Sequence, residues 1–226
     1  SNDSITVNVI IASVNDAPVI TQGELLDVNM SEDGNPVAWS SPVLSATDIE
    51  NDVAGHELIW SVSSGPLQGN ASFGDESNGS TLTYAPNQDF NGTDSFVVEV
   101  TDGNLTDTIT LSVAVASVND APLIDDDDSR ITLLVNEGNV TVATLSATDV
   151  DGDALTWEIV GGADAALFDW DSGTGALIFK TVPDFEDDNR TDGNNTYVLA
   201  VEASDGHLTA DQNITVIVTD VNDPPI

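Results

Sequence analysis

Apolar and polar residues alternate in three similar stretches of this chain. The stretches read DSITVNVIIASVNDAP at 3–18, DTITLSVAVASVNDAP at 107–122 and DQNITVIVTDVNDPP at 211–225. Alternation of this kind is typical of a β-strand with one buried face. Each stretch ends on Asn-Asp and a nearby proline, which cannot continue a strand ladder. We therefore expect three copies of the same strand, each followed by a linker.

Two further pairs of segments repeat at a similar interval. LSATDIEND at 44–52 matches LSATDVDGD at 145–153, and ELIWSVSSG at 57–65 matches ALTWEIVGG at 154–162. Turn-forming residues separate these β-patterned runs, and no segment keeps the helical period of about 3.6 residues. The repetition and the short strands predict two all-β sandwiches with Greek-key connections.

The repeated stretches also indicate where the domains begin and end. Domain 1 is expected at 17–119, and domain 2, with its C-terminal linker motif, at 120–226. Residues 1–16 then correspond to the last strand and linker of a preceding repeat, so we expect the chain to be a piece of a longer array. A strand without its own sheet has unpaired backbone groups, and it can add to the edge of a sheet in the same chain or in another molecule.

The charge balance is strongly acidic. Forty Asp and Glu residues face three basic residues, Arg130, Lys180 and Arg190, which gives a net charge of -37. This charge repels phosphate backbones, so nucleic acid is excluded as a partner, and it disfavours anionic membrane surfaces. No apolar run approaches the roughly 20 residues that a membrane span requires. Such a chain needs either screening by salt or bound cations to stay compact.

Many of the acidic residues lie where a strand is expected to end. Glu32 and Glu137 precede glycine turns, and Asp102 and Asp205 stand in the turns TDG and SDG. Any one of them alone is most simply a turn residue, because Asp, Asn and Gly favour turns. Consecutive sandwiches share a pole, however, so acids from both would converge there and repel one another unless cations bind. The chain has no cysteine and many carboxylates, which favours Ca²⁺ over Zn²⁺.

Domain 2 carries an ordered set of motifs that resembles a cadherin repeat. Its marks are Glu137, DVD at 149–151, FDWDSGTGAL at 168–177, DFE at 184–186, ASDGH at 203–207 and DVND at 220–223. The resemblance implies a seven-stranded Greek-key (immunoglobulin-like) β-sandwich of cadherin type.

Domain 1 is a looser relative. Its YAPNQDFNGTDSFVVEVTDG at 84–103 resembles the cadherin-like tandem repeats of large bacterial surface adhesins. It departs from the cadherin pattern at Asn91, where a ligand Glu is expected, and at Ser117, where the linker Asp is expected. Both changes remove a carboxylate from the junction between the two domains.

The resemblance implies three groups of calcium ligands. At the junction of the two domains they are Glu32, Asp89, Asn119, Asp120, Asp149, Asp151 and Asp205. At the start of the chain they are Asn15, Asp16, Asp48, Glu50 and Asp102. At its end Glu137, Asp184, Glu186, Asp220, Asn222 and Asp223 form one half of a further site. The six junction carboxylates balance at most about three Ca²⁺ ions, since each ion carries two charges. Because Asn91 and Ser117 each remove a carboxylate, we expect roughly one to three ions there.

The sequence also predicts the surroundings of the tryptophans and of one acid outside these groups. Trp60 and Trp157 stand at matched positions of matched segments and are expected in the cores. Trp170 occupies an apolar hairpin position and is expected to pack. If Trp39 or Trp170 is exposed, it could instead stack on a sugar ring. Asp94, in GTDSF, is expected to be a hydrogen-bonding turn residue.

The leading hypothesis is a calcium-rigidified segment of a bacterial extracellular adhesin, secreted or held at the cell surface, that serves cell–cell or cell–surface adhesion. The alternative is a calcium-dependent carbohydrate-binding module of a polysaccharide-degrading system. A third hypothesis is homophilic adhesion, in which the leading strand pairs with another copy of the chain. No arrangement of nucleophile and base stands out, so no enzyme is predicted.

Overall fold

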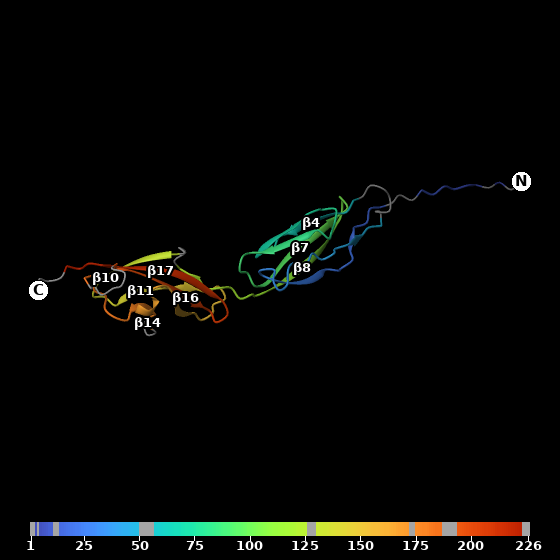
Figure 1. Cartoon of the computed structure of the whole chain (residues 1–226). Helices are drawn as coiled ribbons and strands as arrows, with labels where there is room; N and C mark the ends of the chain where they lie inside the picture. Colours follow the sequence, from blue (N-terminus) through green and yellow to red (C-terminus); the bar gives the residue numbers. More distant parts are fainter. Residues whose placement is uncertain are drawn as a thin grey trace. The chain divides into compact units, whose positions relative to one another are not determined.

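The computed structural model describes residues 3, 5–10, 14–49, 57–125, 130–171, 175–186 and 194–222. The chain divides into two compact units, residues 1–118 and residues 119–226, which we call unit 1 and unit 2 (Figure 1). Among the described residues, no helix is both long and apolar enough to cross a membrane.

Unit 1 is a β-sandwich. Its larger sheet has the strand order β2-β8-β7-β4, its smaller sheet pairs β5 with β6, and β1 pairs with β3. The strands are β1 (Val19–Ile20), β2 (Leu25–Ser31), β3 (Ala46–Thr47), β4 (Ile59–Ser64), β5 (Gly69–Phe73), β6 (Leu82–Pro86), β7 (Gly92–Thr101) and β8 (Thr106–Ala116).

Unit 2 repeats this plan. Its larger sheet has the order β10-β17-β16-β13, its smaller sheet has the order β11-β15-β14, and β12 pairs with β9. The elements are β9 (Leu123–Ile124), β10 (Arg130–Asn136), β11 (Thr141–Thr144), β12 (Ala147–Thr148), β13 (Thr156–Gly161), the 3₁₀ turn η2 (Ala165–Leu167), β14 (Phe168–Asp171), β15 (Ala176–Phe179), β16 (Thr196–Ser204) and β17 (Thr209–Thr219).

In each unit, the last strand pairs in parallel with an early strand. β2 runs parallel to β8 from Leu25 opposite Thr110 to Ser31 opposite Ala116, and β10 runs parallel to β17 in the same way. The last strand also pairs antiparallel with the strand before it, β7 in unit 1 and β16 in unit 2. The repeated sequence stretches at 107–122 and 211–225 are therefore central strands whose ends lead into the linkers.

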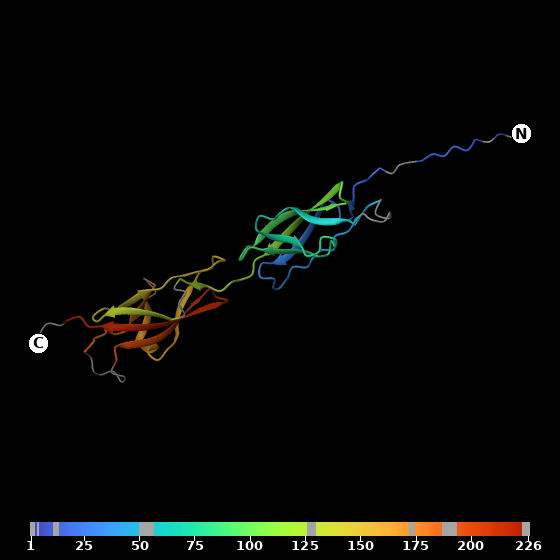
Figure 2. The same cartoon turned by 90° about the horizontal axis from the view of Figure 1, so that it is seen from above.

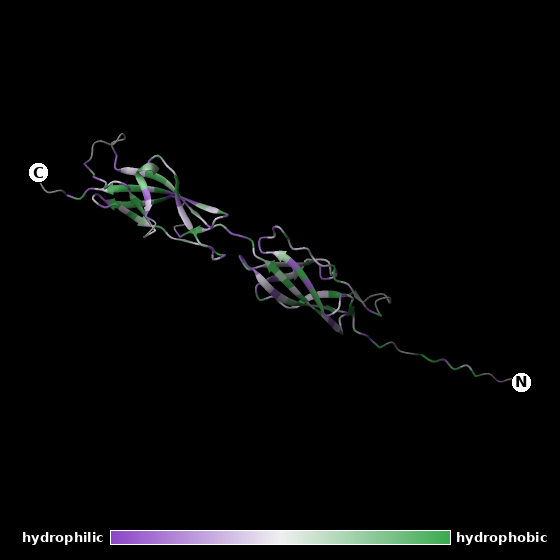
Figure 3. Cartoon of the chain, turned by 90° about the horizontal axis from the view of Figure 1, so that it is seen from below, coloured by the Kyte–Doolittle hydropathy of each residue, from purple (hydrophilic) through white to green (hydrophobic). Residues whose placement is uncertain are grey.

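The alternating pattern places one face of each long strand in a core. In β8, Ile109, Leu111 and Val113 are at most 1 % exposed, and in β17 Ile214 and Val216 are fully buried. Hydrophobic residues concentrate on the strands of both units, whereas the connecting loops are mostly hydrophilic (Figure 3). Each unit has its own cluster of buried apolar side chains. Each unit therefore has a sandwich core of its own. Burial of this kind stabilises by about 25 cal/mol per Å² of apolar surface.

The all-β class with two sandwiches is confirmed. Within the described residues, β1 and β2 together count as one interrupted strand, as do β9 with β10 and β11 with β12. On that count each unit has the seven strands that the cadherin resemblance implies.

Residues 5–10 lie outside both sandwiches. They are drawn as an extended trace without a strand arrow in Figure 2, and they pair with no strand among the residues that the structure describes. Ile5, Val7 and Val9 are 90 %, 76 % and 77 % exposed, although their sequence matches that of Ile109, Leu111 and Val113 of β8.

Trp60, Trp157 and Trp170 follow the packing expectation. Trp60 is buried in the core of unit 1 and packs against Phe73. Trp157 is half-buried and stacks on Trp170 with a ring-centroid distance of 5.3 Å. Trp39 is also half-buried, and its Nε1 donates to a backbone carbonyl 3.2 Å away.

Asp94 is hydrogen-bonded as expected, but the prediction that it lies in a turn is wrong. It is a buried residue of β7, only 5 % exposed. Its carboxylate accepts hydrogen bonds from the backbone N–H groups of Leu67, Gln68 and Ser95 and from the hydroxyl of Tyr84. Four donors replace the water that a buried carboxylate loses, so Asp94 ties the start of β7 to the loop before β5.

Candidate metal centres

The linker that enters unit 1 is fixed by an asparagine. Asn15 Nδ2 donates to Asp102 Oδ2 at 2.8 Å and to the carbonyl of Asp16 at 3.1 Å. Asp102 is buried, and its other oxygen accepts two backbone N–H groups of its own turn. Asp16 and Asp48 line one surface hollow of about 450 Å³. The structure therefore groups the four described members of the first predicted ligand set, while Glu50 lies outside the described residues.

Unit 2 repeats this arrangement. Asn119 Nδ2 donates to Asp205 Oδ2 at 2.8 Å and to the carbonyl of Asp120 at 3.0 Å. The backbone N–H of Asp120 donates to Asp151 Oδ2 at 2.8 Å, and that of Asp151 donates to Asp149 Oδ1 at 2.9 Å. Five predicted ligands of unit 2 thus form one continuous network, in which backbone donors already position the carboxylates.

The electrostatics of this network favour negative charge at Asp205. The pKa of its carboxyl lies below the usual range, first because of the hydrogen bond from Asn119 and then because of two N–H groups of its turn. Asp149 Oδ2 is buried and has no hydrogen-bond partner among the described residues. A buried carboxylate oxygen without a partner is costly, so this atom has an unused capacity for a cation.

In unit 1, a glutamate beside the exit linker also has a carboxylate oxygen that could bind a cation. Glu32 Oε1 accepts the backbone N–H of Val118 at 2.6 Å, which ties the end of β2 to the linker after β8. Glu32 Oε2 is buried without a hydrogen-bond partner in the described part of the chain. Asp89, from the same predicted set, lies in the loop before β7 and has a left-handed φ of +56°.

Three carboxylates converge at the corresponding end of unit 2. Oxygen atoms of Glu137, Asp184 and Glu186 lie within 4.8 Å of one another. Glu137 Oε1 accepts the N–H of Val221 at 2.6 Å, and its Oε2 accepts the N–H of Phe185 at 2.7 Å. Backbone donors fix the Glu137 carboxylate, and the fold brings it beside Asp184 and Glu186, although Asp184 comes 47 positions after Glu137 in the chain (184 − 137).

Two members of this cluster have pKa values shifted in opposite directions, by different causes. The two backbone N–H donors lower the pKa of Glu137. The pKa of Glu186 is raised, first by partial desolvation and then by the negative charges of Glu137 and Asp220. Asp220 is therefore close enough to act on the cluster. Asn222 is exposed, and Asp223 lies outside the described residues.

The donor set of these groups fits a hard cation. All the predicted ligands offer carboxylate, carbonyl or amide oxygens, and Ca²⁺ takes 6–8 such oxygens, some of them from water. The two buried oxygens of Glu32 and Asp149 and the tight cluster around Glu137 are what a cation would neutralise. The residues present therefore fit calcium.

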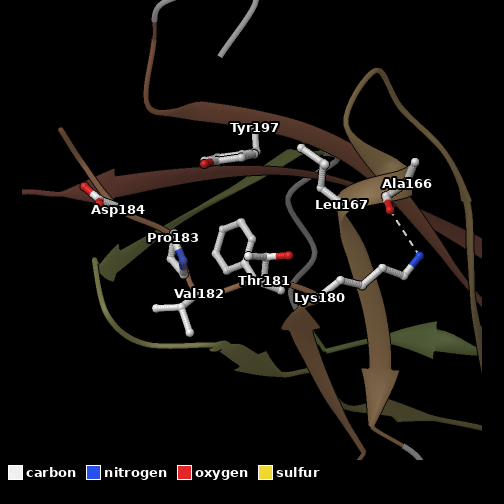
Figure 4. A pocket seen from close by; sticks show the side chains of 9 residues that line it. Ala166, Leu167, Lys180, Thr181, Val182, Pro183, Asp184 and Tyr197 are labelled. Carbon is white, nitrogen blue, oxygen red and sulfur yellow. Dashed lines mark hydrogen bonds between the residues drawn. The ribbon is translucent and has the colours of Figure 1, made fainter. Parts of the chain in front are cut away.

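A cavity of about 350 Å³ beside the terminal cluster had no signal in the sequence (Figure 4). Asp184 lines it at one side, and Lys180 lies at the other side, where its Nζ donates to the carbonyl of Ala166 at 3.1 Å. Leu167 and Val182 form exposed apolar parts of its wall. The cavity combines η2, the end of β15 and the start of β16, which no single sequence motif spans.

Comparisons with known proteins agree with the two-sandwich fold. The family model described as "Bacterial Ig domain" matches residues 15–114. Human "Protocadherin Fat 1" is 27% identical over 96% of this chain, and human "Protocadherin-15" is 36% identical over 35% of it. The chain spans only 5% and 4% of the length of these two relatives.

Solved structures show the same fold. Human protocadherin-24 EC1-2 aligns with a TM-score of 0.53 and 18% identity, covering 92% of this chain and all of that one. Human CDH23 EC21-23 aligns with a TM-score of 0.54 and 18% identity, covering 89% of this chain and 74% of that one. The two units therefore have the fold of tandem cadherin repeats.

Proposed function

We propose that this pair of cadherin-like repeats is a calcium-binding segment of an extracellular adhesin, secreted or at a bacterial cell surface, with a mechanical rather than a catalytic role. The observation that supports it most strongly is the convergence of Glu137, Asp184 and Glu186 within 4.8 Å. The fold agrees with this proposal, because the chain aligns with tandem cadherin repeats of protocadherin-24 and CDH23.

The carboxylates set the mechanical state of the linkers. Without cations, the acids at each pole repel one another, and a net charge of -37 adds to that repulsion. Glu32 and Glu137 each hold the linker that leaves their own unit through one short backbone hydrogen bond. Bound calcium would supply the positive charge and the coordination positions that these oxygens lack. We propose that the linkers stiffen when the predicted ligands are neutralised and that the array then becomes an extended spacer.

Ligand roles follow from the position of each residue. Asn119 and Asn15 orient the linker carbonyl and a turn aspartate, so they preorganise the poles rather than supply charge. The proposed ligands are those described at the poles, namely Asn15, Asp16, Asp48, Asp102, Glu32, Asp89, Asn119, Asp120, Asp149, Asp151, Asp205, Glu137, Asp184, Glu186, Asp220 and Asn222.

Calorimetry that counts Ca²⁺ per chain tests the proposal. Asp149→Asn should reduce the number or affinity of bound ions, because it removes charge from a buried oxygen that has no hydrogen-bond partner among the described residues. Asp27→Asn is the matched control, since Asp27 is an exposed residue of β2 far along the strand from either pole group. Melting curves that coincide with and without EDTA, together with no calcium heat, would refute the calcium role.

A second function is supported by the stacked pair Trp157 and Trp170. Both rings line a hollow of about 440 Å³ together with Glu158, Asp169 and Lys180. An aromatic surface next to polar side chains is the usual composition of a carbohydrate site, so we also propose a calcium-dependent carbohydrate-binding role. Pull-down on insoluble polysaccharides should then be lost in Trp170→Ala and kept in Trp39→Phe.

A further inference from the structure

The chain contains two Asn-Gly dipeptides, Asn78–Gly79 and Asn91–Gly92. In such a dipeptide the backbone nitrogen of the glycine can attack the side-chain amide carbon of the asparagine. Glycine favours this reaction because it has no Cβ to obstruct the ring closure. From the sequence alone, both sites are equally open to this chemistry, and only their folded surroundings can separate them.

Asn78 is held in a rigid turn. Its Oδ1 accepts hydrogen bonds from Ser80 N at 3.0 Å and from Ser80 Oγ at 2.7 Å. Its carbonyl accepts from the backbone and the hydroxyl of Thr81, and Gly79 is buried against the backbone of Leu44. The side-chain amide of Asn78 therefore cannot rotate toward the Gly79 nitrogen without breaking the two hydrogen bonds that Oδ1 accepts from Ser80.

Asn91 has no comparable restraint. Both Asn91 and Gly92 are exposed, at the point where the loop before β7 becomes a strand. Within the described residues, the Asn91 side chain has no hydrogen-bond partner. Gly92 has a φ of +127°, which other residues rarely adopt, so the glycine is fixed at this position by the backbone.

We propose that Asn91 is a site of spontaneous deamidation in the folded protein. The Gly92 nitrogen forms a bond to the Asn91 side-chain carbon, and the C–N bond to the amide nitrogen breaks, which releases ammonia and leaves a cyclic imide. Water then adds to either imide carbonyl and opens the ring, which gives an aspartate or an isoaspartate at position 91. No oxidant or reductant takes part, and the net change is the replacement of –NH₂ by –OH, which ionises.

The new carboxylate has a defined counterpart in unit 2. Asp89-Phe90-Asn91 corresponds to Asp184-Phe185-Glu186, whose two acids belong to the three-carboxylate cluster. Deamidation thus adds the acid that unit 1 lacks at this position. The consequence rests on the proposed calcium function: the modified unit 1 binds calcium more tightly than the newly made protein, in which Asn91 is still an amide.

The experiment measures the two dipeptides in the same molecule. The full chain is incubated at mildly alkaline pH with EDTA and then digested with a protease that cleaves after aspartate and glutamate. Mass spectrometry of the peptides measures the conversion of each asparagine amide to an acid. In buffer, the peptide with Asn91 should convert many times faster than the peptide with Asn78. In concentrated urea both should convert at similar rates, since unfolding removes the turn around Asn78. Similar rates in buffer, or conversion at Asn91 only after unfolding, would overturn the proposal.

Two variants test the physical cause. Ser80→Ala should speed the conversion of Asn78 and leave that of Asn91 unchanged, while Asn91→Gln should abolish conversion at position 91. An unchanged rate at Asn78 in Ser80→Ala would contradict the restraint by the Ser80 hydroxyl, since alanine keeps the backbone N–H that also donates to Asn78.

A separate measurement tests the link to calcium. Asn91→Asp should tighten calcium binding by roughly tenfold, a change of the size that one added charged ligand produces. The exposed Asn70→Asp is the matched control. Selective deamidation with unchanged calcium affinity in Asn91→Asp would leave the modification intact and overturn only the role of position 91 in binding.

Discussion

Asn119 donates a 2.8 Å hydrogen bond to Asp205, and Asn15 donates a 2.8 Å hydrogen bond to Asp102 in the other unit. In both units the asparagine also holds the carbonyl of the aspartate that follows it. The Asn-Asp pair of each linker is therefore a positioning element: the amide neutralises no charge, but it fixes where the charges lie.

This pair predicts the outcome of Asn119→Asp. A second carboxylate beside Asp205 replaces a donor by a like charge, so the melting temperature of unit 2 without calcium should fall by a few degrees. Calcium should restore most of that loss, since the added charge also attracts the ion. Asn213→Asp is the control, because Asn213 is exposed in β17 and its substitution adds the same charge away from the pole. A loss that calcium leaves unchanged would contradict this account.

The strand pattern and the repeats were sufficient to predict the two sandwiches. Alternation over 107–116 specifies that Ile109, Leu111 and Val113 share a face, and the structure buries all three. The grouping of Glu137 with Asp184 and Glu186 came from the resemblance to a known repeat, and the structure brings these oxygens within 4.8 Å.

Other features depend on contacts that no local pattern encodes. Glu32 and Glu137 have matching positions, yet Glu137 Oε2 accepts the N–H of Phe185 whereas Glu32 Oε2 has no partner among the described residues. The difference arises in the loop before β7, where Phe90 N donates to Asn87 O instead and Asp89 takes a left-handed φ. Such a loop conformation cannot be read from strand alternation.

The raised pKa of Glu186 predicts a pH-dependent effect of Glu186→Gln. A carboxyl whose folded pKa lies above its ordinary value of 4.5 contributes its stability below that value and loses it as the pH rises through the folded pKa. At neutral pH without calcium, Glu186→Gln should therefore raise the melting temperature of unit 2, and the gain should vanish below pH 4.5. With calcium the same variant should be less stable than the natural chain.

The cause of this effect can be separated from a general loss of negative charge. Glu202→Gln, a half-buried position on β16 away from the cluster, removes one negative charge of the same kind. If both variants raise the melting temperature equally, the gain reflects net charge and the repulsion within the cluster is not its source.

Tyr84 and Asp94 predict a stability effect that is independent of calcium. Their side chains are joined by a 3.0 Å hydrogen bond inside unit 1, and burial raises the pKa of the Tyr84 hydroxyl, so the phenol stays protonated and donates. Tyr84→Phe should cost about 1–2 kcal/mol of unfolding free energy, because Asp94 keeps three other donors, and Asp94→Ala should cost about 3 kcal/mol. Urea unfolding with EDTA measures both, and equal losses with and without calcium are expected. A Tyr84→Phe protein as stable as the natural chain would show that Asp94 needs no fourth donor.

The leading segment at residues 5–10 predicts a change in association rather than in folding. Ile5, Val7 and Val9 are exposed, yet their sequence matches the β8 residues that fill the core of unit 1. A strand with an apolar face and unpaired backbone groups can add to the sheet edge of a second molecule. Deleting residues 3–10 should leave the melting of both units unchanged, since the segment pairs with no described strand, and it should abolish concentration-dependent association in sedimentation experiments.

The double substitution Thr6→Pro and Asn8→Pro keeps the apolar residues but removes two backbone donors, so it should act like the deletion if strand pairing is the cause. Association that survives the prolines but not the deletion would instead identify the apolar side chains as the source of contact.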